Sequence, residues 1–105
     1  NDSVFTASLA ESRRHYRRQN EKLAAALTHR GFPPFPPGDG LNFWLPLTQP
    51  SQPIALRLAR AGWLVREGEA FGIRTPSHGL RLSPGTLSDD EIERLADDLH
   101  LVLQP

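Results

Sequence analysis

Apolar residues recur along the first thirty positions at the spacing of one face of an α-helix. They stand at intervals of four and seven, and they are Phe5, Leu9, Tyr16, Leu23 and Leu27. Such intervals keep side chains on a single helical stripe. Gly31 suits the left-handed position after a helix end, and Pro33 prevents the helix from continuing. The pattern predicts a helix from about Ser8, or a little earlier, to Arg30, with Ser3 as a rival start.

A proline-rich stretch at residues 32–40 follows this helix. It holds four prolines in nine residues, which exclude a helix and cannot donate the hydrogen bonds of a sheet. We therefore expect a rigid, extended connection here. Residues 41–47 then alternate, with Leu41, Phe43, Leu45 and Leu47 on one face, which predicts a strand with one buried face. Pro46 indicates an edge position or the end of that strand.

The second half of the chain predicts a short helix and then three short strands. Ser51 can cap the helix, Gly62 ends it, and one face carries Ile54, Ala55, Leu58 and Ala61. The apolar runs at residues 63–65, 70–73 and 80–82 predict strands of about four residues. The residues that we expect to form turns between them are Gly68, Pro76, Ser77 and Gly79.

The last element is a helix with a capping box, in which Ser88 and Glu91 stand three residues apart. A strict helical stripe follows, made of Ile92, Leu95, Ala96, Leu99, Val102 and Leu103. The whole order predicts an α+β fold: a small, mostly antiparallel sheet with helices packed on one face, preceded by a long N-terminal helix. We expect a single domain over residues 1–105, in which residues 1–31 form the helix, 32–40 the connection and 41–105 the α/β sandwich.

Composition limits the class of protein. A chain of 105 residues with 38% apolar and 23% charged residues is typical of one ordinary globular domain. Cys is absent, which excludes disulfides, thiol catalysis and thiolate metal sites. Met is also absent, and the chain starts with Asn1. We therefore expect a processed precursor or a piece of a longer protein.

Candidate chemistry is sparse. The one lysine, Lys22, stands on the polar side of the first helix, where nothing lowers its pKa for Schiff-base chemistry. The histidines show no metal-ligand spacing, and they are His15, His29, His78 and His100. These residues do not make a complete active site, so we assign no catalytic, cofactor-binding or metal-binding residue in this chain.

Two groups of arginines have a functional and a structural interpretation. Residues 13–18 contain four arginines, Arg13, Arg14, Arg17 and Arg18. They suit either contacts with nucleic-acid phosphates or, as we prefer, a solvated helix face with ion pairs to a neighbouring domain or subunit. Residues 1–30 carry six basic and three acidic side chains, but residues 84–105 carry one basic and six acidic side chains, which weakens the case for an anionic partner.

Arg81 stands between Leu80 and Leu82 in a predicted strand, so its side chain points to the opposite face. There it is either an ordinary surface arginine or a bidentate hydrogen-bond donor to a carboxylate.

The order of several segments resembles a known family. Residues 79–83 read GLRLS and residues 87–95 read LSDDEIERL, which resembles the closing strand and helix of fold-type I aminotransferases. Residues 16–23, YRRQNEKL, resemble the helix that crosses between the two domains of those proteins. Residues 40–47, GLNFWLPL, and 62–71, GWLVREGEAF, most resemble the MocR-type regulators of the GntR superfamily. These regulators join a winged-helix DNA-binding domain to an aminotransferase-like domain that holds pyridoxal phosphate.

The resemblance covers nearly all of the chain but only the final, small domain of the family. It implies a C-terminal piece of a cytoplasmic, homodimeric regulator whose pyridoxal phosphate, large domain and winged helix lie elsewhere in the parent chain. It also implies that Arg81 binds the α-carboxylate of an amino acid substrate or effector. Arg74, on an earlier predicted strand and outside the motif, is a weaker second candidate. The alternatives are the small domain of a genuine aminotransferase and, third, a free-standing α+β module that binds nucleic acid. The first helix is expected to lack part of its partner surface, and its exposed apolar stripe is expected to promote dimerisation.

Overall fold

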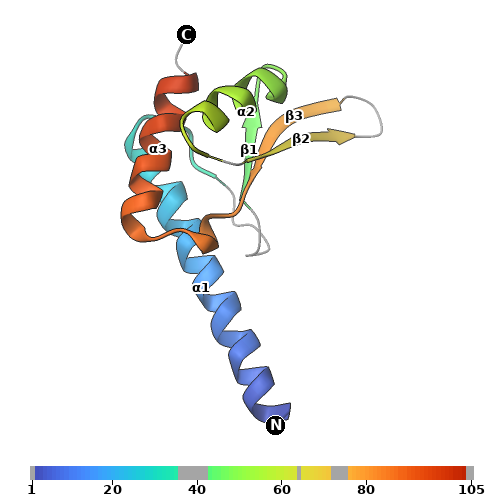
Figure 1. Ribbon diagram of the computed structural model, residues 1–105, viewed down its shortest axis with the longest axis vertical. Coiled ribbons are helices and arrows are strands. Elements are labelled where there is room, and N and C mark those ends of the chain that lie inside the picture. Colours follow the sequence, from blue (N-terminus) through green and yellow to red (C-terminus); the bar gives the residue numbers. More distant parts are fainter. Residues whose placement is uncertain (1, 36–42, 64, 72–75, 104–105) are drawn as a thin grey trace.

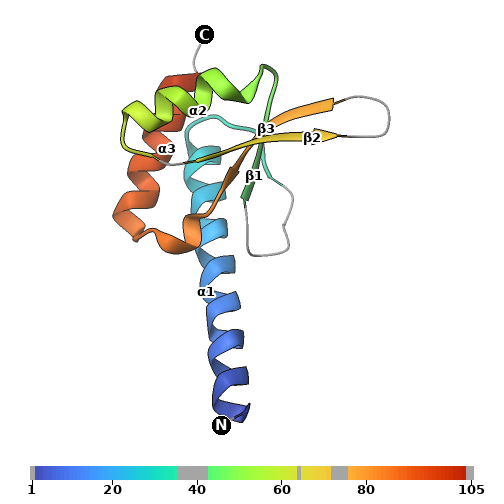
Figure 2. The same ribbon diagram turned by 45° about the vertical axis from the view of Figure 1, so that its right-hand side comes forward.

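The computed structural model describes residues 2–35, 43–63, 65–71 and 76–103, with their side chains from residue 10 on, apart from residues 66–71 and 76–77. Three α-helices lie on one side of a three-stranded sheet (Figures 1 and 2). The helices are α1 (Asp2–His29), α2 (Ser51–Arg60) and α3 (Asp89–Leu103). The strands are β1 (Phe43–Leu47), β2 (Arg66–Phe71) and β3 (Pro76–Leu82), and a 3₁₀ turn, η1 (Pro84–Thr86), joins β3 to α3. The predicted α+β fold with a long N-terminal helix is confirmed.

The sheet is antiparallel, in the order β1-β3-β2, so β3 is its central strand. Phe43 and Leu45 of β1 are buried, whereas Trp44 and Pro46 are exposed, which confirms the predicted alternation. Pro46 stands on an edge strand, where a missing backbone donor is tolerated. Leu41, the first residue of the predicted strand, lies outside the described residues.

Both Gly-terminated helices end in the same way. Gly31 has φ 97° and Gly62 has φ 100°, the left-handed conformation that glycine adopts without penalty. The N–H of Phe32 donates to Leu27 O at 3.1 Å, and the N–H of Trp63 donates to Leu58 O at 2.8 Å. These are Schellman ends, which satisfy carbonyls that the helix leaves without partners. The predicted stops of α1 and α2 are therefore confirmed.

The helix starts differ from the prediction in two places. α1 begins at Asp2, six residues before Ser8, so Ser8 lies inside the helix. α2 has Pro50 as its cap residue, with φ −56° and ψ 142°. Ser51 is the first helical residue, one position after the cap residue, and is 1% exposed. In α3 the capping box is present as predicted, because Ser88 N donates to Glu91 Oε1 and Glu91 N donates to Ser88 Oγ.

The strand prediction is wrong for residues 63–65. Trp63 and Val65 are not in a strand, and Leu64 lies outside the described residues. Trp63 is buried in the core, where its Nε1 donates to Asp98 Oδ2 at 2.6 Å and Arg94 lies 5.5 Å above its ring. The residues that we expected to form turns, Gly68, Pro76, Ser77 and Gly79, all lie within β2 or β3. Pairing across the β2–β3 hairpin recruits them, and their local preference for turns does not decide the outcome.

The core fills the space between the helices and the inner face of the sheet. Its members are Leu23, Ala26, Leu27, Phe43, Leu45, Ile54, Ala55, Leu58, Trp63, Leu80, Leu82, Ile92, Leu95, Ala96 and Leu99. The start of the proline-rich connection closes one end, because Phe35 packs edge-on against Phe43 at 5.0 Å between ring centroids. On the surface, Arg30 joins α1 to α3 through Asp97 and Glu93, each at 2.8 Å. Bonds to Asp97, and then to Glu93, raise the pKa of Arg30 above its ordinary value.

The first half of α1 extends away from this body (Figures 1 and 2). A helix of 28 residues is about 42 Å long, and α1 packs against α3 and η1 only from about Tyr16 onward. Within the predicted apolar stripe, Leu23 and Leu27 are fully buried and Tyr16 is half-buried. The side chains of Phe5 and Leu9 lie outside the described residues. None of the helices that the structure describes combines the length and the apolar character that a membrane crossing needs.

Gly85 anchors α1 where the helix meets the body. His15 Nε2 lies 2.9 Å from Gly85 O, and a Cβ placed on Gly85 would overlap the Tyr16 ring. We expect Gly85→Ala to lower the free energy of unfolding by about 1–3 kcal/mol, because the ring has to move. In a Tyr16→Ala background the same change should cost much less. Urea unfolding of the four proteins of this double-mutant cycle tests the contact, and equal costs in both backgrounds would contradict it.

The start of α3 predicts a loss of stability in acid. A hydrogen bond from Lys22, followed by one from Gln19, holds the pKa of Asp89 below its ordinary value. The backbone N–H of Ser88, followed by its side chain, lowers the pKa of Glu91 in the same way. A depressed carboxyl pKa stabilises the fold above the unfolded pKa of about 4, and the contribution is lost as pH falls through the folded pKa.

We therefore expect the urea midpoint to fall between about pH 5 and about pH 3. The double variant Asp89→Asn, Glu91→Gln should show a shallower fall over the same range. An acid profile identical to that of the unaltered chain would contradict the assignment.

Candidate functional site

Arg81 lies on the central strand and points away from the core. Leu80 is 0% exposed and Leu82 is 2% exposed, whereas Arg81 between them is exposed. The prediction that Arg81 faces the opposite side of the sheet from its neighbours is thus confirmed. The three helices cover the other face, so the guanidinium stands on the open face of the sheet.

The strand register sets the surroundings of Arg81. Trp44 of β1 is its direct partner on one side, and Arg66 of β2 is its partner on the other. The indole of Trp44 extends over Gly79, because a Cβ placed on Gly79 would overlap the indole ring. Residues paired in this way share a face of the sheet. Arg81 therefore stands beside a partly exposed aromatic ring, on the face of the sheet that none of the described helices covers.

Arg81 has no carboxylate partner within the described part of the chain. The ion pairs there join Lys22 to Asp89 and Arg30 to Glu93 and Asp97. The arginine over an aromatic ring is Arg94 on Trp63, not Arg81 on Trp44. A guanidinium in this position can donate two parallel hydrogen bonds to one carboxylate. Arg74, the second candidate, lies outside the described residues, so its relation to Arg81 stays a prediction.

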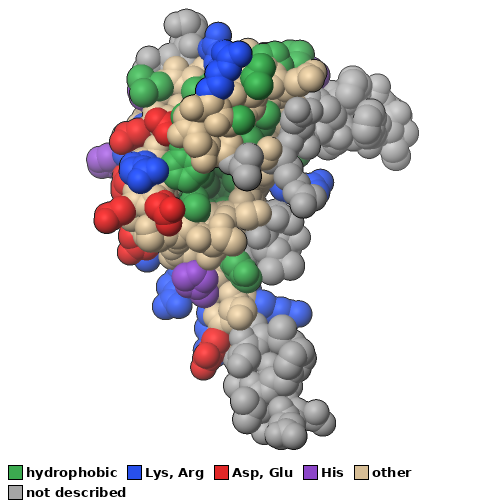
Figure 3. All heavy atoms as spheres, viewed as in Figure 1, with side chains coloured by type: hydrophobic (Ala, Val, Ile, Leu, Met, Phe, Trp, Pro, Cys, Tyr) green, Lys and Arg blue, Asp and Glu red, His purple; other side chains and the backbone are tan. Residues whose placement is uncertain are grey.

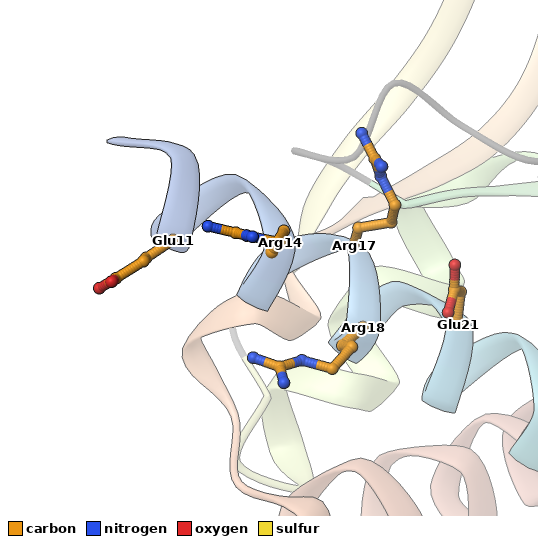
Figure 4. Close-up of a pocket in the computed structure, with 5 residues that line it drawn as sticks. All are labelled: Glu11, Arg14, Arg17, Arg18 and Glu21. Atoms are coloured by element: carbon orange, nitrogen blue, oxygen red, sulfur yellow. The ribbon is translucent and has the colours of Figure 1, made fainter. Parts of the chain in front are cut away.

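The four-arginine cluster of α1 lies elsewhere, near the point where the helix leaves the body. Arg13, Arg14, Arg17 and Arg18 are exposed, and none of the ion pairs above includes them. Glu11 and Glu21 border a shallow surface hollow together with three of these arginines (Figure 4). Figure 4 shows Arg17 and Arg18 pointing to different sides of the helix. Figure 3 shows acidic side chains gathered over α3, above the basic side chains of α1.

The one lysine of the chain does not stand where it could hold pyridoxal phosphate. A Schiff-base lysine needs a lowered pKa, but Lys22 Nζ lies 2.8 Å from Asp89 Oδ1 and its side chain is 46% exposed. Lys22 is therefore held by an ion pair at the surface and does not stand in a closed pocket. Among the described residues no group of three or more His, Cys, Asp or Glu side chains lies where it could hold a metal ion. The arrangement supports binding through Arg81, and no covalent step follows from it.

Comparison of the sequence with known proteins shows the family of this chain. The model of the family "Aminotransferase class I and II" matches residues 1–99. The chain belongs to the aminotransferase class I and II family. It is also 50% identical, over 102 residues, to the "Vitamin B6 salvage pathway transcriptional repressor PtsJ" of Salmonella typhimurium.

The match with the repressor covers 97% of this chain but only 24% of the repressor, so the chain spans about a quarter of that protein's length. Among solved protein structures, none matches this chain. The family match spans nearly the whole of this chain, from residue 1 to Leu99 in α3. The suspected resemblance to an aminotransferase-like regulator is therefore confirmed.

The sequence patterns missed the neighbours of Arg81 on the open face. The alternation of residues 41–47 predicts only that Trp44 lies on the outer face of its strand, and the local sequence predicts a turn at Gly79. A glycine inside a strand does signal the close approach of another group, and that signal was available at Gly79. The pairing of β1 with β3, however, cannot be read from either strand alone, and it is this register that brings Trp44 and Arg81 together.

Proposed function

We propose that this chain is the small domain of a MocR-type transcriptional regulator of the GntR superfamily that responds to an amino acid or amine effector. We further propose that Arg81 binds the carboxylate when that effector is an amino acid. The observation that carries the proposal is Arg81 itself, exposed on the open face of the sheet without a described carboxylate partner. The 50% sequence identity to a transcriptional repressor, over 97% of this chain, supports a regulator in preference to an enzyme.

In this proposal the domain closes over an effector held at pyridoxal phosphate on the large domain of the parent protein. The closure then reaches a winged-helix domain that binds DNA. The ion-paired state of Lys22 supports a cofactor lysine outside this chain. The projecting half of α1 supports a missing partner surface, which the large domain or a second subunit of a cytoplasmic homodimer would supply.

A genuine aminotransferase is the main alternative. The matching family is named for aminotransferases, and Arg81 would then hold a substrate carboxylate while the cofactor supplies the chemistry. Turnover of an amino donor by the full-length protein would favour the enzyme. A free-standing nucleic-acid-binding module is a third candidate, and the exposed arginines of α1 are the observation that favours it. Salt-independent or undetectable DNA binding by the 105-residue chain would remove it.

The deciding experiment is made on the full-length protein that carries this domain. Its absorbance near the visible edge is recorded with added pyridoxal phosphate and then with a panel of amino acids and amines. We expect a cofactor band that one compound shifts, and we expect the same compound to change the binding of an operator fragment. The absence of any band would overturn the proposal. A band accompanied by steady turnover, without any effect on DNA binding, would replace it with the aminotransferase.

A further inference from the structure

Trp44 is an unusual residue for an uncovered sheet face. Its side chain is 37% exposed, whereas the other tryptophan, Trp63, is 9% exposed and bonded through Nε1 to Asp98. A large aromatic side chain is normally buried or serves as a contact residue. No described helix covers the face on which Trp44 lies. The chain thus keeps an apolar surface in contact with water at the one place where Arg81 is also presented.

Gly79 gives Trp44 its position. A side chain at residue 79 would overlap the atoms of the indole six-membered ring, so only glycine leaves room for the ring over the central strand. Glycine inside a strand weakens the strand, because it loses more conformational freedom and contributes no packing. The arrangement therefore holds the indole over β3 at some expense of strand stability.

The spacing of Gly79 and Arg81 along β3 allows one small molecule to reach both the indole and the guanidinium. Gly79 and Arg81 are two residues apart on β3, and alternate residues of a strand lie about 7 Å apart on the same face. A compound that pairs its carboxylate with Arg81 can therefore place a ring or branched group against Trp44. A compound that has a carboxylate but no apolar group leaves the indole in contact with water.

We infer that Trp44, seated on Gly79, is a specificity-determining residue of the Arg81 site and selects carboxylates that carry an aromatic or bulky apolar group. The inference rests on the proposed carboxylate role of Arg81. Aromatic contacts of this kind correspond to a gain in affinity of about 2- to 12-fold over the carboxylate alone. Discrimination between apolar and small effectors then comes from Trp44, while Arg81 supplies the common anchor.

The test uses nuclear magnetic resonance of the full-length protein that carries this domain, with three probes: acetate, benzoate and benzyl alcohol. We expect acetate and benzoate to shift the Nε–H resonance of Arg81. Benzoate should bind more tightly than acetate, by about 2- to 12-fold. Benzoate should also shift the indole N–H of Trp44, while the indole N–H of Trp63 reports that the fold is intact. Benzyl alcohol, which has the ring without the charge, should bind more weakly than benzoate.

Two variants make the test specific. Trp44→Ala should reduce benzoate binding to the level of acetate, and Gly79→Ala should do the same by displacing the indole. Leu56→Ala, which removes an apolar side chain that is 54% exposed on α2, should leave both affinities unchanged. Equal affinity for acetate and benzoate in the unaltered chain would overturn the role of Trp44 while leaving Arg81 as the anchor. If neither probe shifts Arg81, the carboxylate role of Arg81 itself fails.

Discussion

Arg81→Ala is expected to weaken binding of a carboxylate effector to the full-length protein by about 10- to 100-fold without changing the stability of the fold. A charge-assisted hydrogen bond contributes about 1.5–3 kcal/mol, and a bidentate pair adds orientation. Arg81 points away from the core, so its removal leaves the packing around Leu80 and Leu82 in place. The measurement is effector affinity by calorimetry, with urea unfolding of the same samples.

Two controls make this result interpretable. Arg81→Lys keeps the charge but loses the planar fork, so its affinity should lie between those of the unaltered protein and of Arg81→Ala. Arg57→Ala removes another exposed arginine, on α2, on the side of the sheet away from the site. It should bind the effector normally. Equal losses for Arg57→Ala and Arg81→Ala would show that net charge, and not the Arg81 fork, carries the binding.

Leu99→Ala should produce the largest loss of stability among single substitutions in α3. Leu99 is 0% exposed and belongs to the core that joins α1, α3 and the sheet. Truncation of such a residue costs about 2–5 kcal/mol, because it removes apolar contacts and leaves a cavity. A domain of this size is stabilised by about 5–15 kcal/mol in total, so this variant is expected to unfold at a much lower urea concentration.

The same helix offers the control for this prediction. Leu101 lies two residues further along and is 67% exposed. Leu101→Ala should change the free energy of unfolding by less than about 0.5 kcal/mol. If the two variants unfold at the same urea concentration, the packing of α3 against α1 differs from that described above.

Local patterns were sufficient for most helix ends. Gly31 and Gly62 stop their helices because only glycine adopts the left-handed conformation without strain. Ser88 and Glu91 begin α3 because their bonds involve only neighbours in the chain. At the start of α1 the same kind of argument left two starts open, and the observed first residue, Asp2, lies one residue before Ser3 and six before Ser8.

Strand limits depended on partners that are distant in the sequence. Pro76 and Gly79 have a local preference for turns, yet both lie in β3 because that strand pairs along its length with β2. Trp63 is of a residue type that favours strands, yet it packs against α3 and bonds to Asp98. A residue whose environment is set by another element cannot be assigned from its neighbours alone.

The sequence by itself determined the fold class, the family and the outward direction of Arg81, since each depends on local periodicity or on a continuous motif. Only the tertiary structure decided what stands beside Arg81. The register of β1 against β3 places Trp44 opposite Arg81, and the missing side chain of Gly79 seats the indole there. The physical reason is that a strand's own alternation specifies which face a side chain takes, whereas its neighbours across the sheet are chosen by the packing of the whole core.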